Sequence, residues 1–158
     1  MAPEEAVGGD DDGVLEIPVI RLDADLPLPA YARPGDAGAD LVAREAAVLR
    51  CGGGRAAVPT GIALALPPGY AGFEQPRSGL ALRHGVTCLN TPGLIDSGYR
   101  DEVRVLLVNT DPDDDYRVER GDRIAQLVVQ RVEQVAFSPV DELGDTDRGM
   151  GGFGHTGR

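Results

Sequence analysis

The chain of 158 residues is 42% hydrophobic but only 4% aromatic and contains no Trp, which indicates a single domain with an aliphatic core. Its 22 glycines and 12 prolines are typical of many short strands joined by turns. The net charge of −11 argues against a nucleic-acid partner or an anionic membrane surface, and no apolar run reaches the roughly 18 residues of a membrane span.

The first half of the chain predicts strands and one helix. Residues 1–13 are acidic and poor in apolar side chains, so we expect them to be disordered. Strands are expected at 15–22, 57–66 and 70–75, the last two separated by a Pro-Pro-Gly turn. The one helix is expected at 78–84, with Ser78 as its N-cap and Gly85 as its C-terminal stop.

The second half has a stronger strand pattern. β-branched residues are frequent at 102–109 and 123–132, which flank an acidic, Pro-containing loop at 110–115. After Val140 the chain becomes polar and then Gly-rich. We therefore expect an all-β sandwich or barrel at 14–140 with one short helix, followed by a flexible Gly-rich segment at 141–158. Two cysteines without a ligand or disulfide pattern, and no signal-peptide pattern, favour a cytoplasmic protein.

The C-terminal RGMGGFG matches the dinucleotide-binding pattern G-x-G-x-x-G literally, but it lacks the following helix and acidic residue that such a site needs. Composition alone favours a disordered tail. The alternative is a lid that folds over a nucleoside triphosphate. The tail offers a cation, an aromatic ring and imidazole or hydroxyl donors for that role: Arg148, Phe153, His155 and Thr156.

Two internal segments have both a structural and a functional interpretation. PRSG at 76–79 stands where a strand meets the helix, so it is either an ordinary cap with a solvated Arg or a phosphate site. NTPGLIDSGYRDE at 90–102 predicts a turn-rich hairpin. In it, Asn90 suits the amide-like edge of a base, Tyr99 suits a sugar, and Asp96 is either a turn residue or a water-activating base.

Two further segments are weaker on their own. GDRIAQ at 121–126 is either a turn entering a core strand, with Asp122 and Arg123 paired, or a place where Gln126 donates to phosphate. GDAGADL at 35–41 indicates only a turn with two acids.

In this order, GDAGADL, PRSGLA, NTPGLIDSGYRDE, GDRIAQLV and RGMGGFGHTG resemble the five motifs of the homotrimeric dUTP diphosphatases (dUTPases), over residues 34–157. The resemblance implies a jelly-roll-like β fold and a homotrimer in which each of three active sites is built from all three chains. It also implies Mg²⁺-assisted hydrolysis of dUTP to dUMP and pyrophosphate, which removes dUTP and supplies dUMP for thymidylate synthesis.

The resemblance also implies a role for each residue that matches a motif. Asp96 would be the catalytic general base that activates the water attacking the α-phosphorus, and Asp40 would hold Mg²⁺ through water. Uracil and deoxyribose would be recognised by a set of hairpin residues: Asn90, the main chain of Gly93, Leu94 and Ile95, then Tyr99 and the backbone of Arg104. Phosphate and the closed tail would involve Arg77, Ser78, Gly79, Gln126, Arg148, Phe153 (stacked on uracil), Gly154, His155 and Thr156.

The chain departs from the family pattern at two positions, with Asp101 where Gly is usual and His155 where Ser is common. Two other functions stay open on the sequence. One is a dCTP deaminase, or a bifunctional deaminase–diphosphatase, of the same fold, which needs a catalytic Glu and a different hairpin. The other is a non-catalytic nucleotide-sensing protein that has kept the pocket.

Overall fold

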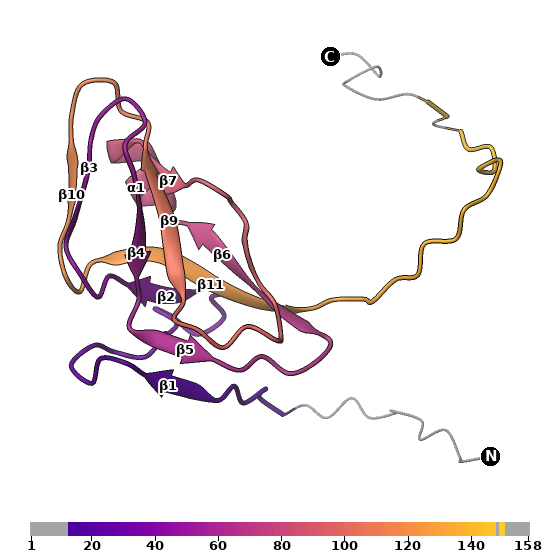
Figure 1. Cartoon of the computed structure of the whole chain (residues 1–158), viewed down its shortest axis with the longest axis horizontal. Helices are drawn as coiled ribbons and strands as arrows, with labels where there is room; N and C mark the ends of the chain where they lie inside the picture. The colour runs from indigo at the N-terminus through magenta and orange to yellow at the C-terminus, as the bar shows by residue number, and fades with distance from the viewer. Residues whose placement is uncertain (1–12, 148, 151–158) are drawn as a thin grey trace.

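The computed structural model describes residues 13–147 and 149–150, and its body consists of short strands with one helix, α1 at Ser78–His84 (Figure 1). The strands are β1 Val19–Arg21, β2 Ala39–Val42, β3 Ala47–Leu49, β4 Arg55–Pro59, β5 Ile62–Leu64, β6 Tyr70–Pro76, β7 Val86–Cys88, β8 Gly93–Ile95, β9 Arg104–Asn109, β10 Tyr116–Val118 and β11 Arg123–Arg131.

The described strands form four small antiparallel sheets. The largest has the order β2-β11-β6-β8, and the second has the order β4-β9-β7. Two pairs, β1-β5 and β10-β3, complete the body. These non-sequential neighbours are typical of a wound β sandwich rather than of a simple meander. The prediction of an all-β, jelly-roll-like fold with one short helix is confirmed.

The core between the sheets is aliphatic, as the composition predicts. Its largest fully buried side chains include Leu41 and Ile124 of one large sheet, Leu107 of the other, and Leu66 from the turn after β5. Burying such side chains removes apolar surface from water and is a main source of stability. Because strands of both large sheets contribute to this core, it fixes the position of β8, which lies within the motif at 90–102, and of β9, which follows that motif.

The strand predicted at 57–66 is divided in the structure. Gly61 adopts a φ of 76°, a conformation that ends the predicted strand between β4, which pairs with β9, and β5, which pairs with β1. Thr60 donates its hydroxyl proton to the carbonyl oxygen of Val103 at 2.7 Å, so the bend is attached to the chain just before β9. The strand predicted at 15–22 is likewise shorter, because only Val19–Arg21 pairs, with β5.

The helix has the predicted bounds, but its predicted N-cap is wrong. Arg77, not Ser78, occupies the N-cap position with φ −91° and ψ 123°, and no side chain bonds the first turn. Gly85 ends the helix in the left-handed conformation at φ 63°, as predicted. Ser78 is therefore the first helical residue, and its hydroxyl is not used for capping.

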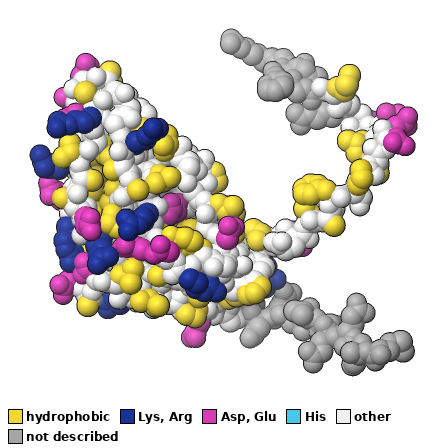
Figure 2. All heavy atoms as spheres, viewed as in Figure 1, with side chains coloured by type: hydrophobic (Ala, Val, Ile, Leu, Met, Phe, Trp, Pro, Cys, Tyr) yellow, Lys and Arg dark blue, Asp and Glu magenta, His cyan; other side chains and the backbone are white. Residues whose placement is uncertain are grey.

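After β11 the chain leaves the body as an extended segment, residues 132–147 (Figure 1). Figure 2 shows hydrophobic side chains along this segment, and Phe137 and Leu143 are 93% and 88% exposed. The division of the chain at residues 13 and 140 stays a prediction. Within the described residues, no helix has the length and apolarity needed to cross a membrane.

Candidate active site

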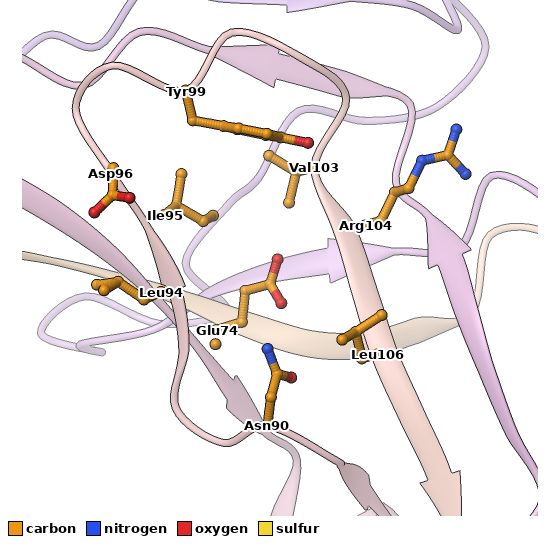
Figure 3. A pocket seen from close by; sticks show the side chains of 10 residues that line it. Glu74, Asn90, Leu94, Ile95, Asp96, Tyr99, Val103, Arg104 and Leu106 are labelled. Carbon is orange, nitrogen blue, oxygen red and sulfur yellow. The ribbon is translucent and has the colours of Figure 1, made fainter.

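A cavity of about 250 Å³ lies between the segment 90–102, which we call the hairpin and which contains β8, and the strand β9 (Figure 3). The strand β8 pairs with β6 and not with a second strand of this segment. The cavity is lined by Glu74, Asn90, Gly93, Leu94, Ile95, Asp96, Tyr99, Val103, Arg104 and Leu106. The structure thus brings together every residue that the hairpin motif assigns to the base, the sugar and the water. The guanidinium group of Arg104 points away from the cavity in Figure 3, in agreement with the backbone role expected for this residue.

The floor of the cavity is formed where β8 pairs with β6. In this antiparallel register Gly93 stands opposite Glu74. A Cβ atom built on Gly93 would lie 2.7 Å from Oε2 of Glu74, a separation shorter than any normal contact. Gly93 therefore allows the Glu74 side chain to lie directly against the hairpin backbone, where a larger residue would collide with it.

Tyr99 is held over the cavity by a hydrogen bond to its own turn. Its hydroxyl group donates to the carbonyl oxygen of Glu102 at 2.8 Å, and the ring lies above the space between the hairpin and β9 (Figure 3). The buried carboxylate of Glu102 accepts hydrogen bonds from the Gly61 N–H at 2.9 Å and from Arg44 at 3.2 Å. Glu102 thereby connects the β4–β5 bend to the end of the hairpin.

We expect Glu102→Ala to lower the free energy of unfolding by about 1–3 kcal/mol, because the buried Gly61 N–H loses its acceptor. The measurement is a urea denaturation curve. Glu119→Ala is the matched control, since Glu119 forms an exposed ion pair with Arg117, and we expect a loss below about 1 kcal/mol there. Equal losses in the two variants would show that Glu102 is not a structural anchor.

Glu74 is a cavity residue that the sequence analysis missed. It is 4% exposed, and burial raises the pKa of its carboxyl group to about 7. The nearby buried thiol of Cys88 has its pKa raised to about 11, by burial first and by the Glu74 charge second. A charged residue within the strand that leads into PRSG was the signal available in the sequence. Val103 and Leu106 were missed because they are ordinary strand residues.

A second group of predicted residues lies at the junction of β2, β11 and the start of α1. Asp40 pairs with Arg123 at 3.3 Å and with Arg77 at 4.0 Å, and Gln126 faces Asp40 across the β2–β11 ladder. Asp122 is not paired with Arg123, because its carboxylate accepts the N–H of Glu119 at 2.8 Å. None of these residues, nor Ser78 or Gly79, lines the hairpin cavity.

The described residues contain no group of three or more His, Cys, Asp or Glu side chains that could hold a metal ion. Asp40 is the one predicted metal residue, and its carboxylate already faces two arginines. Mg²⁺ retains waters and is often held by few carboxylates together with substrate phosphates. The residues present therefore fit a hydrated ion held mainly by the ligand and do not fit a protein-only cage.

Residues 24–157 match the family model described as dUTPase. The chain belongs to the dUTPase family. The Deoxyuridine 5'-triphosphate nucleotidohydrolase of Thermobifida fusca (strain YX) is 62% identical to this dUTPase over 145 residues, which cover 92% of this chain and 80% of that protein. The protein of the same name from Streptomyces griseus is 56% identical over 145 residues, covering 92% and 82%.

The solved structure of the Staphylococcus bacteriophage 80alpha dUTPase with dUpNHpp is similar to this dUTPase, with a TM-score of 0.82 and 27% identity. The match covers 92% of this chain and 100% of that one. The mutant G164S of the same phage enzyme, also with dUpNHpp, matches with a TM-score of 0.82 and 26% identity, covering 92% and 100%.

The C-terminal residues predicted to contact the nucleotide lie outside the described residues: Arg148, Phe153, Gly154, His155 and Thr156. Their roles stay predictions. Asp101, which departs from the family pattern, is exposed and accepts the N–H of Glu102 at 2.7 Å. It is not among the cavity residues.

Proposed function

We propose that Asp96 is the general base of this dUTPase and that the hairpin cavity binds the deoxyuridine part of dUTP. The chain is a dUTP diphosphatase, which hydrolyses dUTP to dUMP and pyrophosphate. The observation that supports the proposal is that one cavity is lined by Asp96, Asn90, the β8 residues and Tyr99.

Asp96 is exposed at the rim of the cavity, where a water molecule can reach it. The carboxylate accepts a proton from this water while the water oxygen bonds to the α-phosphorus. The bond from the α-phosphorus to the bridging oxygen breaks, and pyrophosphate leaves with that oxygen. Phosphoryl-type displacement depends mainly on position and charge neutralisation, so one base with well-placed donors is sufficient.

Recognition of the base is assigned to Asn90 and to the main chain of Gly93, Leu94 and Ile95. An amide side chain and backbone groups offer both donors and acceptors, which match the carbonyls and the N–H of uracil. Tyr99 packs on the deoxyribose, and its ring leaves no room for a 2′-hydroxyl group. A site built from such groups rejects a base that leaves them unpaired.

Phosphate is assigned to Arg77, Ser78, Gly79 and Gln126 of a neighbouring subunit in a homotrimer. Two observations support this. These residues do not line the hairpin cavity of their own chain. In addition, the extended segment after β11 exposes large apolar side chains, such as Phe137, that a partner chain would cover.

Mg²⁺ is assigned to Asp40, which would hold the ion through water. When bound, the ion neutralises charge on the phosphates of dUTP. The C-terminal residues are assigned to the nucleotide, as the RGMGGFGHTG motif implies. Arg148 would contact phosphate and Phe153 would stack on uracil. A cytoplasmic location stays a prediction.

We expect mixed trimers of two inactive variants to recover activity if the sites are shared. Asp96→Asn and Arg77→Ala subunits, co-expressed with different tags and purified through both, would form sites with Asp96 from one chain and Arg77 from another. About a third of the wild-type rate of pyrophosphate release is expected, because in every trimer that contains both variants one of the three sites combines an intact Asp96 with an intact Arg77 of the neighbouring chain.

The controls are the two homotrimers and a mixture made after each has been purified separately. Activity of the co-expressed sample equal to the mean of the two homotrimers would show that each chain completes its own site.

A further inference from the structure

Glu74 brings a carboxyl group to the position in the cavity where the uracil ring is expected. Its Oε2 lies 2.7 Å from the point at which a Cβ of Gly93 would stand, and Nδ2 of Asn90 lies 3.3 Å from the same point. The carboxyl group of Glu74 and the amide of Asn90 therefore flank one position of the hairpin backbone. In Figure 3 both side chains point into the space between the hairpin and β9.

Within the described part of the chain, no cation pairs with Glu74 to keep it ionised. Across its two neighbouring strands it faces Gly93 on β8 and Leu127 on β11. The titratable groups around it are the buried thiol of Cys88 and, on the cavity wall, Asp96, Tyr99 and Arg104. The guanidinium of Arg104 pairs with Glu102 at 3.4 Å. Among the described residues, no ion pair includes Glu74.

A buried carboxyl group without a partner favours its neutral form, because burial penalises the charge. This is the cause of the raised pKa of about 7 for Glu74. The neutral form has one O–H donor, which the carboxylate lacks. Among the described residues, the carboxyl oxygens of Glu74 have no hydrogen-bond partner. No side-chain oxygen there is both sealed from solvent and without a partner, so the Glu74 oxygens are open to the cavity that they line.

We propose that Glu74 is a specificity-determining residue that, as a neutral carboxylic acid, donates a hydrogen bond to a carbonyl oxygen of the uracil ring. This inference rests on the proposed binding of deoxyuridine in the cavity. Uracil presents carbonyl oxygens at both positions beside its N–H. Cytosine presents an amino group at one of them, which is a donor and suits the ionised carboxylate instead.

The direction of the pH effect follows from the donor. Only protonated Glu74 donates, so affinity for dUTP is fully present below the pKa of about 7 and is lost as the pH rises through that value. The carboxylate formed above it accepts a hydrogen bond from the amino group of cytosine. The preference for dUTP over dCTP therefore narrows as the pH rises.

The test compares the KM for dUTP at pH 6 and pH 8 in wild type and Glu74→Gln, with saturating Mg²⁺. The glutamine amide keeps a donor and does not titrate. We expect the wild-type KM to rise by about tenfold more than the KM of the variant, since the neutral fraction falls by that factor across a pKa near 7. The ionisation of the dUTP phosphates affects both proteins equally and cancels in the ratio.

Cys88→Ala is the matched control. The Cys88 thiol, with a pKa of about 11, is neutral at both pH values. This variant should therefore show the same rise in KM between pH 6 and pH 8 as wild type. A second measurement is inhibition of dUTP turnover by dCTP. Its inhibition constant relative to the KM for dUTP should fall between pH 6 and pH 8 in wild type and stay constant in Glu74→Gln.

The proposal would be overturned if the KM for dUTP changed equally between pH 6 and pH 8 in wild type and in Glu74→Gln. It would also be overturned if Glu74→Gln lowered kcat alone. Either result, with dUTP still hydrolysed, leaves the proposed function intact. Absence of dUTP turnover in the wild-type protein at both pH values would instead overturn the proposed function together with this inference.

Discussion

Asp96→Asn is expected to lower kcat for dUTP at least ~100-fold while dUTP still binds, since general-base catalysis contributes about 10²–10⁴-fold. Asparagine has nearly the same size as aspartate but cannot accept the proton from water at neutral pH. Asp96 is exposed at the cavity rim, so the exchange disturbs no packing. The measurements are steady-state pyrophosphate release and a binding titration of dUTP to the variant.

Asp101→Asn is the matched control, because Asp101 is an exposed acid of the same hairpin that does not line the cavity. Its Oδ1 accepts the N–H of Glu102, and an asparagine oxygen can keep that bond. We expect turnover close to that of wild type. A fully active Asp96→Asn variant would refute the base assignment, and an equal loss in Asp101→Asn would show that hairpin charge alone is responsible.

Removal of residues 148–158 is expected to lower kcat/KM roughly 100-fold and to leave the trimer intact, because the tail is proposed as a lid that positions the triphosphate. The removed segment contains Arg148 and Phe153, the cation and the ring assigned to phosphate and uracil. Steady-state kinetics report the first effect, and light scattering after size exclusion reports the second, as a mass three times that of the shortened chain.

Removal of residues 2–12 is a control of equal length at the other end, and it should change neither turnover nor mass. Loss of the trimer in the C-terminal deletion would refute the lid, since the segment would then be part of the assembly. Unchanged kinetics would refute it directly.

The hairpin site could be predicted from the sequence because its residues are close together in the chain. Asn90, Asp96 and Tyr99 lie within one turn-rich segment, and the structure places all three in one cavity. The helix at 78–84 was predictable for a similar reason, since a local stop such as Gly85 depends on backbone conformation alone. The order of the five motifs then indicated the family, which the comparison with the dUTPase family model confirms.

The rest of the cavity depends on strand register, which the sequence alone did not determine. Glu74 reaches the site only because β6 pairs with β8 so that Glu74 stands opposite Gly93. The division of the predicted strand at Gly61 depends on the contact with Glu102, 41 positions away in sequence. The predicted N-cap at Ser78 was wrong because the chain turns one residue earlier, at Arg77, without any side-chain bond.

Two functions from the sequence analysis compete with the dUTP diphosphatase. A dCTP deaminase of the same fold would release ammonia from dCTP, and a nucleotide-sensing protein would bind dUTP without turnover. The relatives described above carry the name of a dUTP nucleotidohydrolase, which favours hydrolysis of the triphosphate. Because Glu74 is proposed to distinguish uracil from cytosine, the comparison of dUTP with dCTP is the most informative one.

The most direct test of this account incubates the full-length protein with Mg²⁺ and, separately, dUTP, dCTP, dTTP and UTP, and measures pyrophosphate and ammonia. We expect pyrophosphate from dUTP, little from the other three nucleotides, and no ammonia from dCTP. Ammonia from dCTP, or no pyrophosphate from dUTP, would contradict the account.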